Sequence, residues 1–409
     1  MKLKIENIGK IKCADIDLSS ITVITGVNGT GKSTVAKSLF SAFNGMANTY
    51  NQIQNDRDYS LTRLVISSSA GISKAFKFRN ELLKNKNDIT KVQMIAKKYL
   101  DDEEIEFFMK RYEDIMSVND KEILDLIIER RFNREFNNQI NNIYNNKEGK
   151  INLTIKDKTT EFFIENNKFK QINNIMELGT EAVYIDDFKC IENIEYRNEN
   201  EEDDDVLRIM GLLSSDINEV DHKSHLYRKI KILNTNGVIE EILNMNKFES
   251  IFQDVFKDFP GKMTISKNSK LQYSLEGTDK AIDIRNIAEG MKNFLIIKLL
   301  INQEKLLENG VLILDEPEIH LHPEWQLLFA ELIVLINKHL KTHILINTHS
   351  PYFLDAIGVY SKKHGISDDK YYLAELDGNI YDVTNELERA YIKLARPLQE
   401  LEDEESENY

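Results

Sequence analysis

Residues 21–40 read ITVITGVNGTGKSTVAKSLF, and this stretch decides the fold. An apolar, strand-like run leads into a glycine-rich loop, which a helical pattern follows. Gly26, Gly29 and Gly31 let the backbone curl so that successive N–H groups face inward and surround phosphate oxygens. Lys32 adds a positive charge beside the β- and γ-phosphate oxygens. The stretch therefore predicts a strand, a phosphate-binding loop (the Walker A motif) and a helix, in that order.

The residues after the glycines complete the predicted nucleotide site. Ser33 offers a hydroxyl to Mg²⁺. The helix expected from Thr34 to Phe40 points its positive end at the bound anion. The sequence thus predicts ATP and Mg²⁺ as ligands. The residues expected to contact the nucleotide in this loop are Asn28, Gly29, Thr30, Gly31, Lys32, Ser33 and Thr34.

A second motif lies far downstream at residues 311–316, where VLILDE places four apolar residues before two carboxylates. Such a run predicts a buried parallel strand that ends at the phosphate-binding edge of a sheet, the Walker B strand. Asp315 is expected to hold Mg²⁺ through water. Glu316 projects differently and can accept a proton from the water that attacks the γ-phosphate. Together with the Walker A loop, this motif predicts ATP hydrolysis.

A third strand is predicted at residues 343–347 (HILIN), after an amphipathic helix at 325–338. This strand delivers Thr348, His349 and Ser350 to the same edge of the sheet. His349 is a candidate for contacting the γ-phosphate and reporting its presence, and a purely structural histidine is the alternative.

Two strings, DEPEIHLHPEWQ (315–326) and INTHSPYFLDAI (346–357), resemble the ABC-type ATPases of the SMC, RecF and OLD superfamily. They are especially similar to the compact OLD-like ATPases of bacterial anti-phage defence systems. The resemblance implies an α/β fold, an ABC-type P-loop ATPase head with a mixed sheet and an inserted helical subdomain. In that superfamily, a signature loop of one head contacts the γ-phosphate held by another. The resemblance therefore implies a homodimer or a higher homo-oligomer.

Residues 284–294 (IRNIAEGMKNF) stand where that signature belongs. Compared with the transporter-type signature Leu-Ser-Gly-Gly-Gln, Gly290 matches the first glycine, while Glu289 replaces the serine and Lys292 the glutamine. Lys292 is either a substitute cation for the γ-phosphate or a solvated lysine at a helix start. The backbone N–H groups at Gly290 and at the start of the following helix can bind an anion in either case.

The chain has 409 residues, of which 41% are hydrophobic and 30% charged, as in a globular protein with a sizeable core. No stretch approaches the roughly 18 uninterrupted apolar residues of a membrane-spanning helix. The N-terminus alternates like a strand and lacks the apolar core of a signal peptide. Two cysteines, Cys13 and Cys190, are too few for a disulfide framework. We therefore expect a cytoplasmic protein without a membrane partner.

The net charge of −15 argues against a general nucleic-acid coat, which needs Lys and Arg to neutralise phosphates. The segment 74–98 is nevertheless basic, with eight Lys or Arg residues against two acidic ones. Its Phe76 and Phe78 can either stack on bases or pack in a core. The segment is thus a candidate nucleic-acid contact, with a solvated helix face as the alternative. The acidic residues 199–205 and 401–407 are expected to form a solvated loop and a frayed tail.

Strand and helix patterns divide the chain into segments. Strands are expected near 2–6, 12–17, 151–157, 161–166 and 182–186, helices near 78–148 and 206–257, and a hairpin at 262–277. The expected domains are an N-terminal lobe with Walker A at 1–70 and 150–195, a helical subdomain inserted at 71–149, a helical region and hairpin at 206–280, a lobe with the signature, Walker B and switch histidine at 281–395, and an acidic tail at 396–409.

OLD nucleases carry a Toprim nuclease domain after their ATPase, and the strand-like residues 371–383 are too few to form one here. In a defence role, a toxic effector would have to come from another chain, as in the Septu and PARIS systems that the ATPase region resembles. The leading interpretation is a homo-oligomeric ATPase whose slow hydrolysis controls an effector protein, a nuclease, encoded nearby. The alternatives are a RecF-like DNA-repair ATPase that clamps DNA and a non-catalytic, ATP-dependent scaffold.

Overall fold

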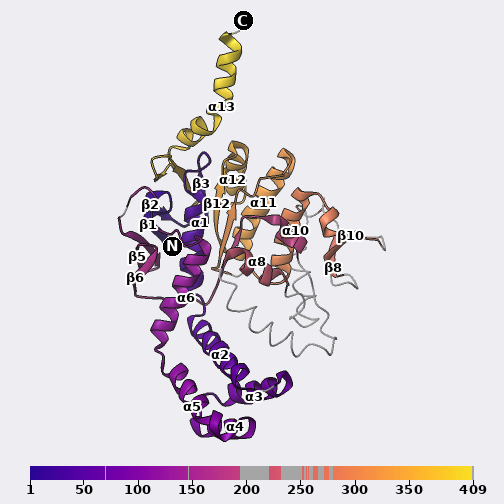
Figure 1. Ribbon diagram of the computed structural model, residues 1–409. Coiled ribbons are helices and arrows are strands. Elements are labelled where there is room, and N and C mark those ends of the chain that lie inside the picture. Colours follow the sequence, from indigo (N-terminus) through magenta and orange to yellow (C-terminus); the bar gives the residue numbers. More distant parts are fainter. Residues whose placement is uncertain are drawn as a thin grey trace. The chain divides into compact units, whose positions relative to one another are not determined.

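The chain divides into two compact units, and each is described by itself. A sheet unit contains Met1–Ala47 and the described residues from Arg131 onwards, and a helical unit contains Asn48–Arg130. Figure 1 shows their elements along the chain. The structure, a computed structural model, describes residues 1–69, 71–145, 147–193, 221–231, 251–252, 255, 257, 261–265, 271–275, 280–306 and 308–407.

An 11-stranded mixed sheet in the order β6-β5-β4-β1-β2-β14-β13-β3-β12-β11-β7 organises the sheet unit. Its parallel part runs from β13 through β3, β12 and β11 to β7. The mixed α/β fold predicted from the sequence is confirmed. The strands are β1 (Lys2–Ile8), β2 (Ile11–Asp17), β3 (Ile21–Thr25), β4 (Gly149–Ile155), β5 (Lys158–Glu165), β6 (Lys168–Asn173), β7 (Ala182–Ile185), β11 (Val311–Asp315), β12 (His343–Thr348), β13 (Lys370–Ala374) and β14 (Asn379–Asp382).

Helices cover the parallel part, and β3 and β11 are therefore buried along their whole length. Leu312 and Leu314 of β11 belong to one apolar core with Phe294 of α10 and Phe329 of α11. Figure 1 shows α11 and α12 side by side, and they pack together in the sheet unit. The helices of this unit are α1 (Lys32–Gly45), α8 (His222–Lys231), α10 (Glu289–Asn302), α11 (Pro323–Leu340), α12 (Pro351–Lys363) and α13 (Leu387–Glu407).

Residues 401–407 are the last residues of helix α13, so the expectation of a frayed tail is wrong. Leu and Glu favour a helix in this segment, and Arg396 forms an i,i+4 ion pair of 2.8 Å with Glu400. The acidic residues 199–205 lie outside the described residues, as does most of the helix expected at 206–257.

A second, antiparallel sheet, in the order β10-β9-β8, precedes the signature segment. Strands β8 (Gly261–Ile265) and β9 (Leu271–Leu275) form the hairpin predicted there, and β10 (Ala281–Asp283) extends it. The 3₁₀ turns η1 (Phe188–Asn193) and η2 (Ile284–Asn286) lie after β7 and before α10.

The helical unit has its own aromatic core. Phe78 is fully buried and packs against Tyr99 and Phe108, each with a ring-centroid distance of 5.1 Å. Helix begins at Thr49, earlier than the residue 71 at which the insertion was expected, and the domain division as a whole stays a prediction. Its helices are α2 (Thr49–Ser68), α3 (Ile72–Asn85), α4 (Ile89–Tyr99) and α5 (Asp102–Ser117), and α6 (Asp120–Glu135) leads back to the sheet unit.

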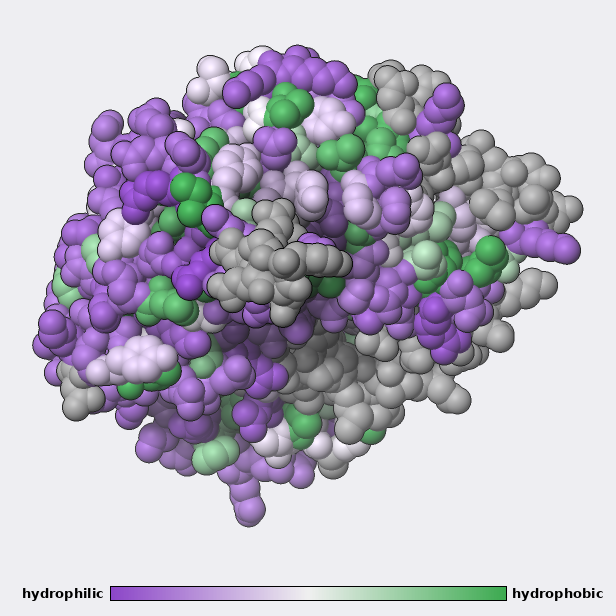
Figure 2. All heavy atoms as spheres, turned by 90° about the horizontal axis from the view of Figure 1, so that it is seen from above, coloured by the Kyte–Doolittle hydropathy of each residue, from purple (hydrophilic) through white to green (hydrophobic). Residues whose placement is uncertain are grey.

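One face of the molecule is mainly polar (Figure 2). Figure 2 shows one face on which hydrophilic residues predominate and hydrophobic ones are scattered. Among the described helices, none has both the length and the apolar character that crossing a bilayer requires.

Candidate nucleotide site

The phosphate-binding loop joins β3 to α1, as the sequence predicts. Gly26, Gly29 and Gly31 have φ values of +148°, +78° and +98°, in the range that favours glycine. Space also requires glycine at two of these positions. A Cβ at Gly26 would lie 2.4 Å from the carbonyl oxygen of Ala374, and one at Gly31 would lie 2.4 Å from Cδ1 of Ile11. The loop is therefore closely packed between β13 and β2.

Lys32 lies inside the loop, with 5% of its side chain exposed. Its ammonium donates hydrogen bonds to the carbonyl oxygens of Gly26, at 2.9 Å, and Val27, at 3.2 Å. Burial lowers the pKa of Lys32, and the nearby carboxylates oppose this effect. A buried cation that is held mainly by backbone carbonyls gains strongly from an anion, so the loop is prepared for a phosphate.

The other predicted loop residues differ in exposure. Asn28, Gly29 and Ser33 are exposed, so they are accessible to a ligand. Thr30 is buried, and its hydroxyl donates to the Val27 carbonyl at 2.9 Å, which stabilises the turn. Thr34 is half-buried. Their contacts with a nucleotide stay predictions.

Asp315 ends β11 and is nearly buried. The hydroxyl of Tyr184 donates to its Oδ2 at 2.9 Å, and the amide of Asn347 donates to its Oδ1 at 3.0 Å. These two residues belong to β7 and β12, the strands on either side of β11. The carboxylate of Asp315 is therefore fixed from both sides.

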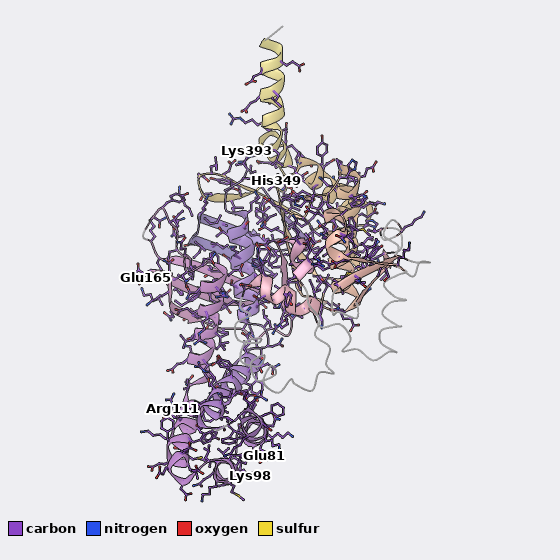
Figure 3. The ribbon with its side chains drawn as sticks, turned by 45° about the vertical axis from the view of Figure 1, so that its right-hand side comes forward. Glu81, Lys98, Arg111, Glu165, His349 and Lys393 are labelled. Carbon is purple, nitrogen blue, oxygen red and sulfur yellow. The ribbon has the colours of Figure 1, made fainter. Side chains whose placement is uncertain are left out.

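Glu316 follows in a left-handed conformation, with φ of +51°. This turn directs it away from Asp315, and its N–H donates to the carbonyl oxygen of Asn347 at 2.8 Å. Its Oε1 lies 3.8 Å from Nζ of Lys32 and 3.3 Å from Nδ1 of His349, which Figure 3 labels. The structure thus brings Lys32, Glu316 and His349 together from the ends of three adjacent strands.

Glu318 also belongs to this group of side chains, although the sequence suggested no role for it. Only 4% of its side chain is exposed. Its Oε1 accepts hydrogen bonds from the Thr348 hydroxyl and from the His349 N–H, the latter at 3.2 Å. Burial raises the pKa of Glu318. The sequence offered one clue to this role of Glu318: it is a second carboxylate, separated from Glu316 only by Pro317.

The residues present suit a magnesium ion. Mg²⁺ prefers oxygen ligands, and Ser33 and Asp315 supply a hydroxyl and a carboxylate. A buried oxygen beside Asp315 reinforces the match: Asn347 donates to Asp315, and its own Oδ1 has no hydrogen-bond partner among the described residues. Buried acceptors of this kind need a partner, which ordered water around a bound ion can provide.

The signature segment differs from its sequence-based interpretation. Gly290 is buried, and a Cβ there would lie 2.9 Å from the His320 carbonyl oxygen, so close packing alone requires glycine. Lys292 is 2% exposed and forms an ion pair with Glu192. The alternative of a solvated lysine is therefore wrong. The phosphate role of Gly290 and Lys292 stays a prediction, and Lys292 would have to exchange Glu192 for a phosphate.

The basic segment 74–98 is partly neutralised within the helical unit. Glu81 and Lys98, both labelled in Figure 3, form an ion pair in which Oε1 and Nζ are 2.6 Å apart. Lys86 pairs with Asp58. Phe78 is a core residue and is not available to stack on bases, whereas Phe76 is half-buried.

A phosphate loop after β3, carboxylates at and just after the end of β11 and a histidine after β12 form the arrangement of a P-loop ATPase. The chain belongs to the AAA ATPase domain family, whose model matches residues 1–354. The family match confirms that the sequence resemblance is to ATPases.

The chain is similar to one curated relative and to several solved structures at low sequence identity. A retron Vc95 probable ATPase from Vibrio cholerae serotype O1 biovar El Tor is 24% identical over 375 residues, which span 82% of this chain and 67% of that protein. An SMC head domain from Thermotoga maritima has a TM-score of 0.41 at 12% identity, covering 94% of this chain and 97% of that one. An SMC head bound to the C-winged helix domain of ScpA has a TM-score of 0.44 at 13% identity, covering 95% and 98%.

Proposed function

We propose that this chain binds ATP with Mg²⁺ and hydrolyses it slowly. The observation that supports the proposal is the meeting of three side chains at one sheet edge. Glu316 Oε1 lies 3.8 Å from Lys32 Nζ, in the phosphate loop, and 3.3 Å from Nδ1 of His349. A cation for phosphate, a base for water and a group that senses the γ-phosphate are the parts that phosphoryl transfer needs.

Each residue has a defined part in this mechanism. The loop N–H groups and the start of α1 hold the phosphates, while Lys32 exchanges its carbonyl partners for phosphate oxygens. Ser33 and Asp315 would hold Mg²⁺, which supplies charge neutralisation at the phosphates when bound. Glu316 accepts a proton from the attacking water. His349 is beside Glu316 and donates to the γ-phosphate.

The decisive experiment measures ATP binding and phosphate release by the full chain with Mg²⁺. We expect micromolar to millimolar affinity and slow turnover, on the order of the lower end of typical enzyme rates or below. A chain that binds no ATP, or whose affinity is unchanged by Lys32→Ala, would overturn the proposal.

We further propose that the chain forms a homo-oligomer and controls a separate effector, a nuclease, in anti-phage defence. The resemblance to OLD-like ATPases and the retron ATPase relative support a defence role. Purification of the tagged chain with its native neighbouring genes, followed by mass spectrometry, tests this proposal. We expect the effector to be retained by Glu316→Gln and lost from Lys32→Ala, and equal recovery with both variants would contradict ATP-dependent control.

The DNA-clamping alternative has its own test. The partial neutralisation of 74–98, for example by the pairs Lys98–Glu81 and Lys86–Asp58, weakens it. DNA-stimulated ATPase activity that charge reversal at Lys84 and Lys97 abolishes would favour DNA binding. The scaffold alternative predicts that the effector binds with ATP present although phosphate release is absent.

A further inference from the structure

Tyr184 contacts the predicted magnesium ligand from a neighbouring strand. Tyr184 of β7 lies opposite Ile313 of β11, two residues before Asp315. Its hydroxyl donates to Asp315 Oδ2 at 2.9 Å, while Asn347 donates to Oδ1. A carboxylate oxygen has two acceptor sites, so each oxygen of Asp315 keeps one for a metal-bound water. The two donors thus fix the carboxylate without blocking it.

The ring of Tyr184 is itself held in place. The side chain is 1% exposed. The ring stacks on the imidazole of His222, with ring centroids 4.1 Å apart and ring planes at 26°. It also packs against the ring of Phe40 in α1, with a centroid distance of 6.0 Å. Its position is therefore set by β7, α1 and α8 together.

His222 is fixed by two carboxylates. Its Nδ1 lies 2.6 Å from Glu135 Oε1, and its Nε2 lies 3.0 Å from Asp186 Oδ2. Its backbone N–H donates to Glu135 Oε2 at 3.0 Å, so the first residue of α8 is also bonded to Glu135. Because Glu135 holds both the ring and the backbone N–H of His222, and Asp186 lies within ion-pair distance of Nε2, the imidazole supports the Tyr184 ring.

We propose that Tyr184 is a positioning residue for Asp315 and that His222 holds Tyr184 in that position. The inference rests on the proposed function, because it concerns the same magnesium site. Groups that orient a metal ligand commonly contribute about 10- to 100-fold to metal affinity. A purely structural tyrosine would bury its ring and satisfy its hydroxyl without affecting the metal.

The test compares Tyr184→Phe with Tyr372→Phe in the full chain. Tyr372 is a matched control, since it is also buried in the same sheet, and its hydroxyl accepts from the Asp17 N–H. The readout is the affinity for Mn²⁺ of the protein loaded with a non-hydrolysable ATP analogue. Electron paramagnetic resonance measures this binding. We expect about tenfold weaker Mn²⁺ binding for Tyr184→Phe only, with analogue affinity in EDTA unchanged. Unchanged or tighter Mn²⁺ binding would overturn the inference.

A double-mutant cycle tests the part of His222. His222→Gln should weaken Mn²⁺ binding in the wild-type background and have no further effect in Tyr184→Phe. Equal effects in both backgrounds would show that His222 does not act through Tyr184. If the wild-type chain binds no analogue with Mg²⁺ present or in EDTA, the proposed function itself fails. If it binds analogue and Mn²⁺ but Tyr184→Phe is unaltered, the positioning role alone fails.

Discussion

The carboxylate of Glu316 lies 3.8 Å from the ammonium of Lys32, although the two residues are 284 positions apart in the sequence. The strand order β3-β12-β11 creates this proximity, because the parallel strands end at one edge. Lys32 is held by two loop carbonyls and one carboxylate, and an incoming phosphate can replace them. The strand order therefore brings the cation and the candidate base of the proposed site together.

Removing the Lys32 cation should abolish nucleotide binding. We expect Lys32→Ala to weaken ATP affinity at least about 100-fold, since a charge-assisted hydrogen bond contributes roughly 1.5–3 kcal/mol and a buried charge more. Isothermal titration calorimetry measures the change. Lys37→Ala on the same helix is the control, because Lys37 donates to the Glu135 carbonyl oxygen, away from the loop. Similar losses in both variants would point to damage of α1 and not to a phosphate contact.

Neutralising Glu316 should separate binding from turnover. General bases contribute about 10²- to 10⁴-fold to rate, so Glu316→Gln should slow phosphate release by that factor while ATP affinity is retained or increased. The substitution removes a negative charge beside Lys32, so the γ-phosphate is repelled less and binds at least as tightly. Light scattering with ATP should then show a trapped oligomer. Glu324→Gln, at an exposed position, is the control. Normal turnover by Glu316→Gln would mean that another group activates water.

The sequence was sufficient for the parts of the site that local pattern encodes. The glycines of the loop, the strand ending at Asp315 and the strand before His349 are each recognisable within a few residues, because backbone geometry and burial dictate those residue types. Parallel strand ends then had to meet at one edge. The mixed α/β fold followed from the same patterns.

Other features depend on strand neighbours that no local pattern specifies. Tyr184 acts on Asp315 only because β7 pairs with β11, and nothing in AVYID distinguishes that tyrosine from a core residue. The burial of Lys292 depends likewise on Glu192, which belongs to η1. Tertiary contacts of this kind override local preference, which is why the alternative of a solvated Lys292 is wrong.

Glu318 should act through His349. Removing its carboxylate by Glu318→Ala deprives the Thr348 hydroxyl and the His349 N–H of their acceptor. We expect about tenfold slower turnover with ATP affinity unchanged, by loss of one to two hydrogen bonds that orient the histidine. Glu318→Gln keeps a carbonyl acceptor and should restore most of the rate. Equal rates for Glu318→Ala and wild type, measured by phosphate release, would remove Glu318 from the site.

The protonation of His222 should make stability depend on pH. Burial alone lowers the pKa of His222, but the neighbouring carboxylates of Asp186 and Glu135 outweigh this effect and raise the pKa to about 9. An unfolded histidine has a pKa of about 6.5. The folded state therefore binds the proton more tightly, and its stabilisation is complete below pH of about 6.5 and is lost as pH rises through about 9. His225 does not contribute to the pH dependence between pH of about 6.5 and 9, because burial lowers its pKa to about 4.

Urea unfolding at pH 6.5, 8 and 9.5 measures this effect. The single tryptophan, Trp325, reports on the sheet unit that contains His222. We expect the unfolding free energy of the wild type to fall with rising pH by on the order of 3 kcal/mol more than that of His222→Gln, at about 1.4 kcal/mol per pKa unit. His322→Gln, at an exposed position, should follow the wild type. Parallel curves for wild type and His222→Gln would show that the imidazole carries no such proton, because the substitution would then have removed no linked titration.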